Sequence, residues 1–337
     1  MPTHSAHISG LGTYLPERVV TNHEMSQHMN TSDAWIRERS GILSRRYAGK
    51  EEPTSVLGTL ACQKALEDAG TSIEEIDMIF AATLSPDHYF PGIGVQIQNA
   101  LGAKHIGAID IRGQCSGFTW AFSTANAYLR AGMARKVLVV GAERHSPVFG
   151  WDDDDRNVSV LFGDGAGAIV LEAQPETTPR QGILDNLVGC DGSGLPHLIM
   201  ERPGMGQGRD DFINHDDLEA KNFRPRMQGR QVFKHAVTRM SEAATQLLQR
   251  NNLDVADLDL LIPHQANIRI IEAVGQKLGI DAEKVVVNIQ HTGNTTAATI
   301  PLAMEAARQD GRLQKGKCVL SVAFGAGFTW GANLFYW

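Results

Sequence analysis

The sequence of 337 residues has no long hydrophobic run, because no apolar stretch approaches the roughly 18 residues that a membrane-spanning helix needs. Its first ten residues lack the basic and apolar segments of a signal peptide, so we expect a cytoplasmic protein. Basic residues never run to five and the net charge is −7, which argues against nucleic-acid binding. The four cysteines form no CxxC pair and no zinc-ligand spacing, a pattern typical of free thiols in a reducing compartment.

Two long stretches of the chain resemble each other. Asp77 precedes an apolar strand that leads into a polar loop, and Asp259, 182 residues later, does the same. The repeat continues through an apolar strand at 105–111 in the first half and one at 285–288 in the second. Hydrophobic residues make up 42% of the chain, enough for a large core. The pattern predicts a duplicated α/β unit with buried strands.

The repeat suggests a division of the chain into three parts. We expect an N-terminal half at residues 1–173, a connecting segment at 174–228 and a C-terminal half at 229–337. Glycine, proline and charged residues are frequent at 189–226, which predicts a long loop there. Its large apolar side chains either line a substrate mouth or anchor the loop: Met200, Met205, Phe212 and Phe223.

Cys115 stands between the apolar run at 105–111 and a segment with helical spacing at 118–129. A helix N-terminus favours the thiolate, which is the nucleophilic form, although a free cysteine is often only a small buried hydrophobe. The equivalent loops of the second half carry His264 and Asn294. Asn294 alone would suit a helix cap. Because corresponding loops of duplicated halves converge, we expect the three side chains to share one cleft.

Three other segments suggest further chemistry or exclude it. The closely spaced glycines of 323–331 can bring backbone N–H groups near a ligand, as an oxyanion hole requires. The four adjacent carboxylates of 152–155 cannot all face one metal ion, so we expect a solvated turn. The glycines of 162–168 lack the lysine of a phosphate-binding loop and predict a close-packed turn.

With these motifs in order, the chain resembles β-ketoacyl-[acyl-carrier-protein] synthase III enzymes essentially from end to end. The motifs that carry the resemblance are Gly12-Thr-Tyr-Leu-Pro16, Thr31-Ser-Asp-Ala-Trp-Ile36, Ser40-Gly-Ile42, Gln114-Cys-Ser-Gly-Phe118, Phe162-Gly-Asp-Gly-Ala-Gly-Ala168, Gly229-Arg-Gln-Val-Phe-Lys234, Pro263-His-Gln-Ala-Asn267, Gly293-Asn-Thr-Thr296 and Phe324-Gly-Ala-Gly-Phe-Thr-Trp-Gly331. The resemblance implies a thiolase fold, in which two pseudo-symmetric α/β halves form a five-layer αβαβα sandwich.

The resemblance also implies an acyltransferase that condenses an acyl-CoA primer with malonyl-acyl carrier protein, with loss of CO₂. Cys115 would accept the acyl group, and His264 with Asn294 would handle the extender unit. Backbone amides of Cys115 and Ala326 would form the oxyanion hole. This chemistry needs no metal or redox cofactor, because hydrogen bonds to the thioester oxygen can stabilise the enolate.

Further residues are implied by position in the matching motifs. The CoA thioester would contact Thr31, Trp35, Arg39, Arg156, Gly229, Phe233 and Asn267. The acyl pocket would be formed by Gln114, Phe162, Phe324 and Phe90, the last from a neighbouring subunit, which implies a homodimer. A basic patch for the acyl carrier protein would include Lys234, Arg269 and Lys277.

The sequence departs from the common family pattern at a few positions, and these keep an alternative open. Arg112 and Gln114 precede the nucleophile in place of small apolar residues, and Ala326 stands where glycine is common. A related ketosynthase or acyltransferase of an alkylquinolone, resorcinol or polyketide pathway, with a longer or unusual donor, fits the same motifs. A degradative thiolase would need a second cysteine in the last glycine-rich loop, and Cys318 lies before it. A non-catalytic partner subunit usually lacks part of the Cys-His-Asn set, which is complete here.

Overall fold

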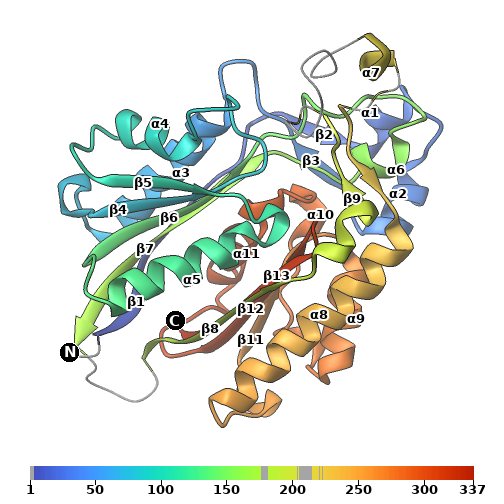
Figure 1. Ribbon diagram of the computed structural model, residues 1–337. Helices are drawn as coiled ribbons and strands as arrows, with labels where there is room; N and C mark the ends of the chain where they lie inside the picture. The colour runs from blue at the N-terminus through green and yellow to red at the C-terminus, as the bar shows by residue number, and fades with distance from the viewer. Residues whose placement is uncertain (1–3, 176–180, 203, 205–214, 220, 222) are drawn as a thin grey trace.

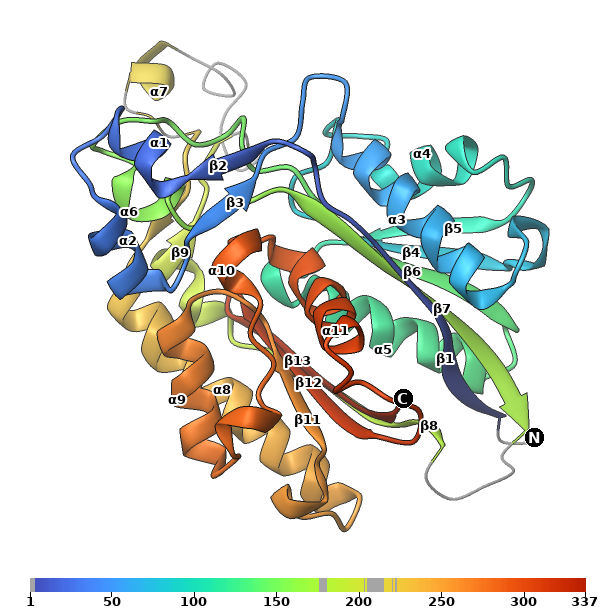
Figure 2. The same cartoon turned by 180° about the vertical axis from the view of Figure 1, so that it is seen from behind.

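The computed structural model describes residues 4–175, 181–202, 204, 215–219, 221 and 223–337. These residues form two main β-sheets, with helices between the sheets and on both outer faces (Figure 1). Seen from behind, the same five layers follow one another across the molecule (Figure 2). A sheet with apolar residues on both faces needs cover on each side, which the helical layers supply.

The first sheet has the strand order β1-β7-β6-β4-β5. Its two inner neighbours β4 and β6 are parallel, and β7 is antiparallel to both β6 and β1. The bounds of its strands are β1 His4–Tyr14, β4 Met78–Ala82, β5 Gly107–Ile111, β6 Lys136–Glu143 and β7 Gly165–Pro175.

The second sheet has the order β11-β12-β13-β8 and repeats the pattern of the first. Here β11 and β12 are parallel, and β13 is antiparallel to both β12 and β8. The bounds of its strands are β8 Gly182–Cys190, β11 Leu260–Pro263, β12 Cys318–Gly325 and β13 Thr329–Tyr336. Pairing type and order therefore match for four strands of each sheet, and β5 alone has no counterpart strand, which confirms the predicted duplication.

The helices fall into an inner layer and two outer layers. The outer helices of the first half and of the second half cover opposite faces of the molecule, and the inner pair lies between the sheets (Figures 1 and 2). The outer helices are α3 Thr54–Ala69 and α4 Ile93–Ala100 on one side, and α8 Gly229–Arg250 and α9 Ile268–Leu278 on the other. The inner pair is α5 Gly117–Arg130 and α11 Thr299–Gln309.

Shorter elements gather at one end of the sandwich (Figure 1). The two small sheets pair β2 Val19–Thr21 with β3 Ser44–Arg46, and β9 Leu198–Ile199 with β10 Arg226–Met227. The short helices are α1 Asn22–Ser26, α2 Asp33–Ser40, α6 Arg156–Ser159, α7 His215–Glu219 and α10 Ile289–Thr292. Together they stand beside the end of the second sheet at which β11 and β12 finish.

The acidic residues that mark the repeat do the same structural work in each half. The Asp77 carboxylate accepts hydrogen bonds from the backbone N–H groups of Arg135 and Lys136 at the start of β6. The Asp259 carboxylate accepts one from the N–H of Cys318 at the start of β12. Each aspartate thus ties the beginning of one parallel strand to the next, which explains why the sequence repeats there.

Two predicted strands differ from the structure. The segment at 105–111 was expected to be buried, but β5 pairs only with β4 and leaves Gly107, Ile109 and Asp110 exposed in the single chain. The second-half counterpart at 285–288 forms only one bridge, between Val285 and Leu261. There the N–H of Asn288 donates to the Gln265 side chain instead of a neighbouring strand, so no ladder develops.

The connecting segment at 174–228 contains more structure than a loop. Its strand β8 is the edge strand of the second sheet, paired with β13 over most of its length. By hydrogen bonding this strand belongs with the C-terminal half. The segment also holds β9 and β10, whereas Met205 and Phe212 lie outside the described residues.

Gly141 of β6 marks a very close approach between the halves. A Cβ atom there would lie 2.5 Å from the carbonyl oxygen of Ala297, just before α11. Only glycine allows this contact without a shift of the backbone. The approach fixes the start of α11, and with it the loop that carries Asn294, against the first sheet.

Candidate active site

A cavity of about 630 Å³ opens between the two halves and is lined by Cys115, His264 and Asn294. The structure therefore brings together the three side chains expected to share a cleft. Each lies just beyond a strand or in a loop at the same edge of a sheet. The carboxyl ends of parallel strands all lie at one edge, which brings such residues close together. The remaining lining is mostly apolar and includes Phe162 and Phe324.

Cys115 lies in a 3₁₀ turn, Gln114–Ser116, directly before α5. Gln114 has a φ of +48°, an unusual value for a non-glycine residue, so the backbone turns sharply before the cysteine. Gly325 at the end of β12 packs against this turn, and a Cβ there would lie 3.0 Å from the Cys115 nitrogen. Glycine at 325 is required for the turn and the strand end to meet.

The expectation that the helix N-terminus favours a Cys115 thiolate is wrong for the free protein. Burial, followed by the negative charge of Glu143, raises the pKa of the Cys115 thiol to about 12. The backbone N–H of Cys115 acts in the opposite direction but is outweighed. Loss of hydration disfavours the charged form more than one N–H group favours it. The thiol is therefore protonated at neutral pH, and its reaction requires a proton acceptor.

His264 follows β11 and is 2% exposed. Its Nδ1 lies 2.6 Å from Thr299 Oγ1, which fixes the ring and leaves Nε2 toward the cavity that His264 lines. Burial lowers the pKa of His264 to about 3, so the imidazole is neutral at physiological pH. A neutral imidazole with one free nitrogen can accept or donate a proton, depending on its tautomer.

Asn294 is held on both sides of its backbone by the first half of the chain. Its N–H donates to Leu161 O at 2.8 Å, and its carbonyl oxygen accepts from Gly163 N at 3.1 Å. Its side-chain Oδ1 accepts the N–H of Thr296 at 2.9 Å. Within the described residues, Nδ2 has no hydrogen-bond acceptor, so the amide N–H₂ is available to a ligand in the cavity.

Backbone N–H groups near Cys115 fit the expected oxyanion hole. In the part of the chain that is described, neither Cys115 N nor Ala326 N donates to another backbone or side-chain acceptor. Gly325, rather than Ala326, lines the cavity. An amide without a backbone acceptor is able to bind the negative charge that develops on a thioester oxygen.

Five of the residues expected to contact the CoA thioester line the same cavity: Trp35, Arg39, Gly229, Phe233 and Asn267. The guanidinium groups of Arg39 and Arg156 lie 4.7 and 5.3 Å from the Trp35 ring centre, so both face the indole. Asn267 caps α9 through Oδ1 and donates from Nδ2 to Arg39 O. Its amide thus joins α9 to α2 as well as lining the cavity.

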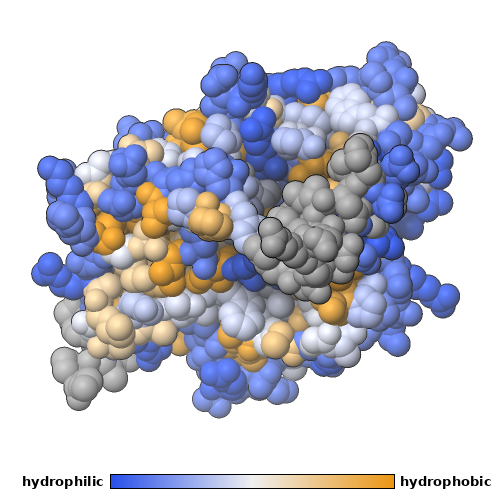
Figure 3. Space-filling model, turned by 45° about the horizontal axis from the view of Figure 1, so that its top comes forward, coloured by the Kyte–Doolittle hydropathy of each residue, from blue (hydrophilic) through white to orange (hydrophobic). Residues whose placement is uncertain are grey.

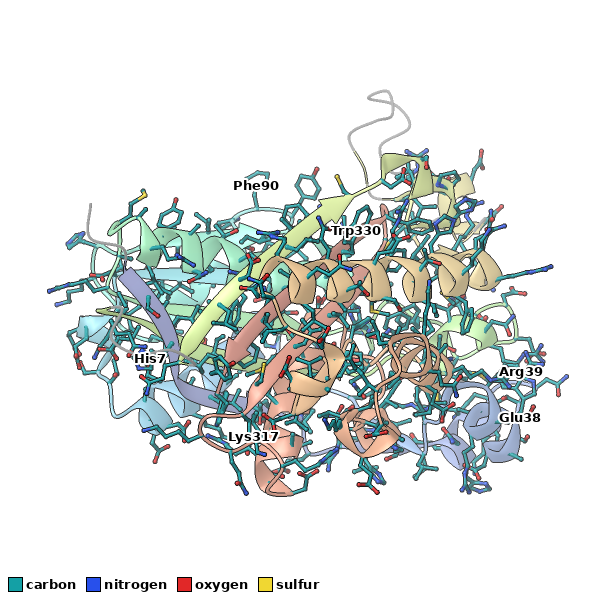
Figure 4. All side chains as sticks on the ribbon, turned by 90° about the horizontal axis from the view of Figure 1, so that it is seen from below. His7, Glu38, Arg39, Phe90, Lys317 and Trp330 are labelled. Atoms are coloured by element: carbon teal, nitrogen blue, oxygen red, sulfur yellow. The ribbon has the colours of Figure 1, made fainter. Side chains whose placement is uncertain are left out.

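Other expected residues lie outside the cavity lining. They are Thr31, Phe90, Gln114, Arg156, Lys234, Lys277 and Ala326. Phe90 is 80% exposed, and Figure 4 shows it well separated from Arg39 at the outline of the molecule. Gln114 therefore does not narrow the entrance in the single chain. Of the expected carrier-protein contacts, Arg269 alone lines the cavity.

The acidic run at 152–155 forms the expected turn, with Asp153 and Asp154 exposed, and its carboxylates also form ion pairs that the sequence did not predict. Arg224 lies 3.0 Å from Asp152 and 2.8 Å from Asp155, and Lys221 pairs with Asp152 and Asp154. The Arg224 guanidinium lowers the pKa of Asp152 to about 2. These contacts hold the segment that ends in Pro225 and Met227, both of which line the cavity.

Several site residues were missed by sequence reasoning. Glu143 is the last residue of β6 and His145 comes just after it, and both are almost fully buried. Thr296 and Thr299 follow Asn294 and are buried as well. A signal existed, because polar residues directly after an apolar strand were the reason for choosing His264. Among the described residues there is no cluster of potential metal ligands, and none of their helices is both long and apolar enough to cross a bilayer.

Comparison with known proteins agrees with the fold and identifies the family. The sequence model described as 3-oxoacyl-[acyl-carrier-protein] synthase III matches residues 109–192, and the model of its C-terminal part matches residues 248–337. A β-ketoacyl-[acyl-carrier-protein] synthase III from Sinorhizobium medicae is 45% identical over 332 residues, which cover 98% of each chain.

Solved structures extend the comparison. The 3-oxoacyl-[acyl-carrier-protein] synthase III of Aquifex aeolicus superposes with a TM-score of 0.89 at 40% identity, covering 98% of this chain and 100% of that one. The priming β-ketosynthase of the R1128 polyketide pathway gives a TM-score of 0.90 at 34% identity, over 100% and 97% of the two chains. The predicted thiolase fold is confirmed.

Fold and site together define a condensing enzyme of the thiolase type, an acyltransferase. The chain belongs to the β-ketoacyl-[acyl-carrier-protein] synthase III family. Full-length relatives that carry this name favour the primary expectation over an enzyme of a specialised pathway.

The low pKa of His264 predicts a specific pH dependence of stability. The unfolded histidine has a pKa of about 6.5, so below that value the unfolded chain binds a proton that the folded chain, with a pKa of about 3, does not. Acidification from about pH 7.5 to about pH 4.5 should therefore lower the free energy of unfolding of the wild type by on the order of 2 kcal/mol more than that of the His264→Gln variant.

Denaturant unfolding at both pH values measures this difference. His23→Gln, which replaces an exposed histidine, is the matched control and should keep the wild-type pH dependence. Equal pH dependence in the wild type and His264→Gln would contradict a neutral, buried His264.

Proposed function

We propose that the enzyme condenses an acyl-CoA primer with malonyl-acyl carrier protein through an acyl-Cys115 intermediate, releasing CO₂. The observation that carries the proposal is the meeting of Cys115, His264 and Asn294 in one cavity, each with a polar atom available to a ligand. A nucleophile, a neutral imidazole and an amide donor are what acyl transfer and enolate formation require.

In the first half-reaction, the Cys115 sulfur attacks the thioester carbonyl while its proton passes to His264 Nε2. His264 lines the same cavity and is neutral, so it offers an unprotonated nitrogen to the thiol that burial keeps protonated. The backbone N–H groups of Cys115 and Ala326 would bind the oxyanion, and the departing CoA sulfur would take the proton from His264. One acyl–sulfur bond is broken and another is formed.

In the second half-reaction, the malonyl thioester loses CO₂ and its enolate carbon attacks the acyl-Cys115 carbonyl. The bond from the acyl carbon to the Cys115 sulfur then breaks, and the sulfur takes up a proton from solvent to regenerate the thiol. Charge accumulates on the thioester oxygen, where Asn294 Nδ2–H and His264 Nε2–H would donate hydrogen bonds. The Thr299 hydroxyl donates to Thr296 O at 2.8 Å, so it accepts from His264 Nδ1–H, 2.6 Å away, and leaves Nε2 unprotonated for the first half-reaction. For Nε2 to carry the proton in the second half-reaction, the hydroxyl would turn from Thr296 O and donate to Nδ1.

The entrance supports binding of a CoA thioester. Trp35 offers an aromatic face with Arg39 and Arg156 beside it, and Arg230 and Arg269 also line the cavity. Guanidinium groups suit phosphate and stack on planar rings. Thr31 is adjacent in sequence to the Asn30 carbonyl that Arg156 binds.

The pantetheine chain carried by the acyl carrier protein would enter the cavity through the same entrance. Gly229, Phe233 and Asn267 line the path toward Cys115 and would border the pantetheine chain. Lys234 and Lys277, with Arg269, would receive the acidic carrier protein. All four cysteines are free, which supports a reducing, cytoplasmic location.

A homodimer is part of the proposal. β5 is an edge strand with Ile109 39% exposed, and Val95, Tyr89 and Phe90 are also exposed. An exposed apolar edge strand is a template for pairing with another chain. Figure 3 shows hydrophobic residues interrupting the hydrophilic surface of the face that it presents. Phe90 would then complete the acyl pocket of the partner.

Acylation of Cys115 is the first expected result. Incubation with acyl-CoAs from acetyl to dodecanoyl should add one acyl mass to the wild type and none to Cys115→Ala, as measured by intact-mass spectrometry. Cys190→Ala removes an exposed cysteine and should acylate normally. The preferred chain length separates a primer synthase from the specialised-pathway alternative, and an adduct that survives in Cys115→Ala would refute the assignment.

Asn294→Ala should separate the two half-reactions. Loss of one donor to a developing oxyanion typically lowers a rate by ~10²–10³, so condensation with malonyl-acyl carrier protein should fall by this factor. Acylation of Cys115 should persist, because Asn294 acts only on the extender unit. Radiolabelled product formation and intact-mass spectrometry measure the two steps, and wild-type condensation would show that Asn294 has no such role.

The dimer can be tested by sedimentation. We expect wild-type protein to sediment at twice the 36.7 kDa mass of one chain. Ile109→Arg should shift it toward the monomer, because a charge on the edge of β5 opposes pairing. Val19→Arg, at another exposed apolar position, should not. A wild type that sediments as a monomer would overturn the proposed dimer.

A further inference from the structure

Thr296 connects both catalytic groups of the second half. Its N–H donates to Asn294 Oδ1 at 2.9 Å. Its carbonyl oxygen lies 2.8 Å from Thr299 Oγ1, which in turn is 2.6 Å from His264 Nδ1. One buried residue, 1% exposed, therefore stands behind both the amide and the imidazole that face the cavity.

The backbone of Thr296 is held in an unfavourable conformation. Its φ is +44°, in the left-handed region that β-branched residues avoid. Such a conformation persists only where the surroundings hold it, and such residues cluster at functional sites. This conformation aims the Thr296 N–H back at Asn294, so whatever stabilises it also sets the orientation of the Asn294 amide.

The side chain of Thr296 is held by His145, which comes from the other half of the chain. His145 Nε2 lies 2.9 Å from Thr296 Oγ1. His145 is 4% exposed, and its backbone N–H donates to Asp164 Oδ1 at 2.7 Å. Its ring packs edge-on against the Phe162 ring, with 5.2 Å between the two ring centres. Its position is therefore fixed by the glycine-rich turn at 162–168, which also holds the backbone of Asn294.

Glu143 favours one tautomer of His145, the one that carries its proton on Nε2, which is the nitrogen near Thr296. Its Oε2 lies 3.7 Å from His145 Nε2 and also accepts hydrogen bonds from the Thr83 and Ser85 hydroxyls. A carboxylate beside Nε2 favours the tautomer protonated there. His145 Nε2–H is then the donor and Thr296 Oγ1 the acceptor.

We infer that His145 is a positioning residue of the condensation half-reaction. It holds Thr296 in the left-handed conformation, and Thr296 then binds Asn294 Oδ1 and turns Nδ2 toward the cavity. The inference rests on the role of Asn294 proposed above. Because Asn294 acts only in condensation, whereas His264, linked to Thr296 through Thr299, acts in both steps, loss of this contact should slow condensation much more than acylation of Cys115.

Two pairs of variants test the inference. His145→Leu and Thr296→Val remove the contact, whereas His145→Gln and Thr296→Ser keep a hydrogen-bonding atom near the same place. The first pair should lower the condensation rate by up to about 100-fold, as misplacement of a reacting group by about 1 Å can do, and the second pair should restore most of it. Single-turnover acylation by acyl-CoA, followed by intact-mass spectrometry, should fall much less than condensation in the first pair and stay near the wild-type rate in the second.

A double variant distinguishes the loss of this one contact from general damage to the fold. If both residues act through one contact, His145→Leu combined with Thr296→Val should condense no more slowly than either single variant. Losses that multiply in the double variant, or an equal loss of acylation, would overturn the inference. Should His145→Leu not fold, as judged by circular dichroism, the comparison of Thr296→Val with Thr296→Ser decides.

Asn294→Ala, assayed in parallel, distinguishes the proposed role of Asn294 from the positioning role of His145. If Asn294→Ala condenses at the wild-type rate, the proposed role of Asn294 fails and the inference fails with it. If Asn294→Ala is slow but His145→Leu and Thr296→Val condense normally, only the positioning role of His145 is overturned.

Discussion

The bridge between Phe162 and Asn294 is the contact on which the site depends. Asn294 takes its backbone partners from Leu161 and Gly163, in the opposite half of the chain. Gly163 has no room for a side chain, because a Cβ there would lie 2.2 Å from Thr292 O. The two duplicated halves are therefore joined by main-chain hydrogen bonds at the place where their strand-end loops meet. A cavity at that junction necessarily draws its reactive groups from both halves.

A second constraint is electrostatic. Burial keeps the Cys115 thiol protonated and the His264 imidazole neutral, so the free site holds a neutral pair. Charge then develops only as substrate reacts, and it is met by hydrogen-bond donors already in place. Hydrogen bonds to buried groups of this kind are effective only if the donors are held rigidly, which makes the contacts of Thr296, Thr299 and His145 as important as the catalytic atoms.

How far the sequence predicts this structure can be followed in particular residues. Asp77 and Asp259 revealed the duplication because each performs the same hydrogen bonding in its half. Cys115, His264 and Asn294 were found because each follows a recognisable strand or glycine-rich pattern. These features are local, or repeat at a fixed offset, and local pattern is what a single sequence contains.

What the sequence did not predict depends on neighbours that are distant in the chain. The apolar residues of β5 suggest burial, but its position at the edge of the sheet follows from strand order. The pKa of Cys115 depends on burial by the second half and on the charge of Glu143. The acidic residues at 152–155 meet their cations about 70 positions later. In each case the decisive partner lies in another part of the chain.

Residues distant in the chain also determine the width of the cavity. Gln114, the departure nearest the nucleophile, does not line the cavity, whereas Leu198 and Met227 do. Those two belong to the paired strands β9 and β10, and ion pairs between 152–155 and Arg224 hold the chain just before β10. The width of the cavity on this side therefore depends on surface charge pairs as well as on core packing. A change in this strand pair or in its ion-paired anchor would therefore alter the cavity more directly than a change at Gln114, which lies outside its lining.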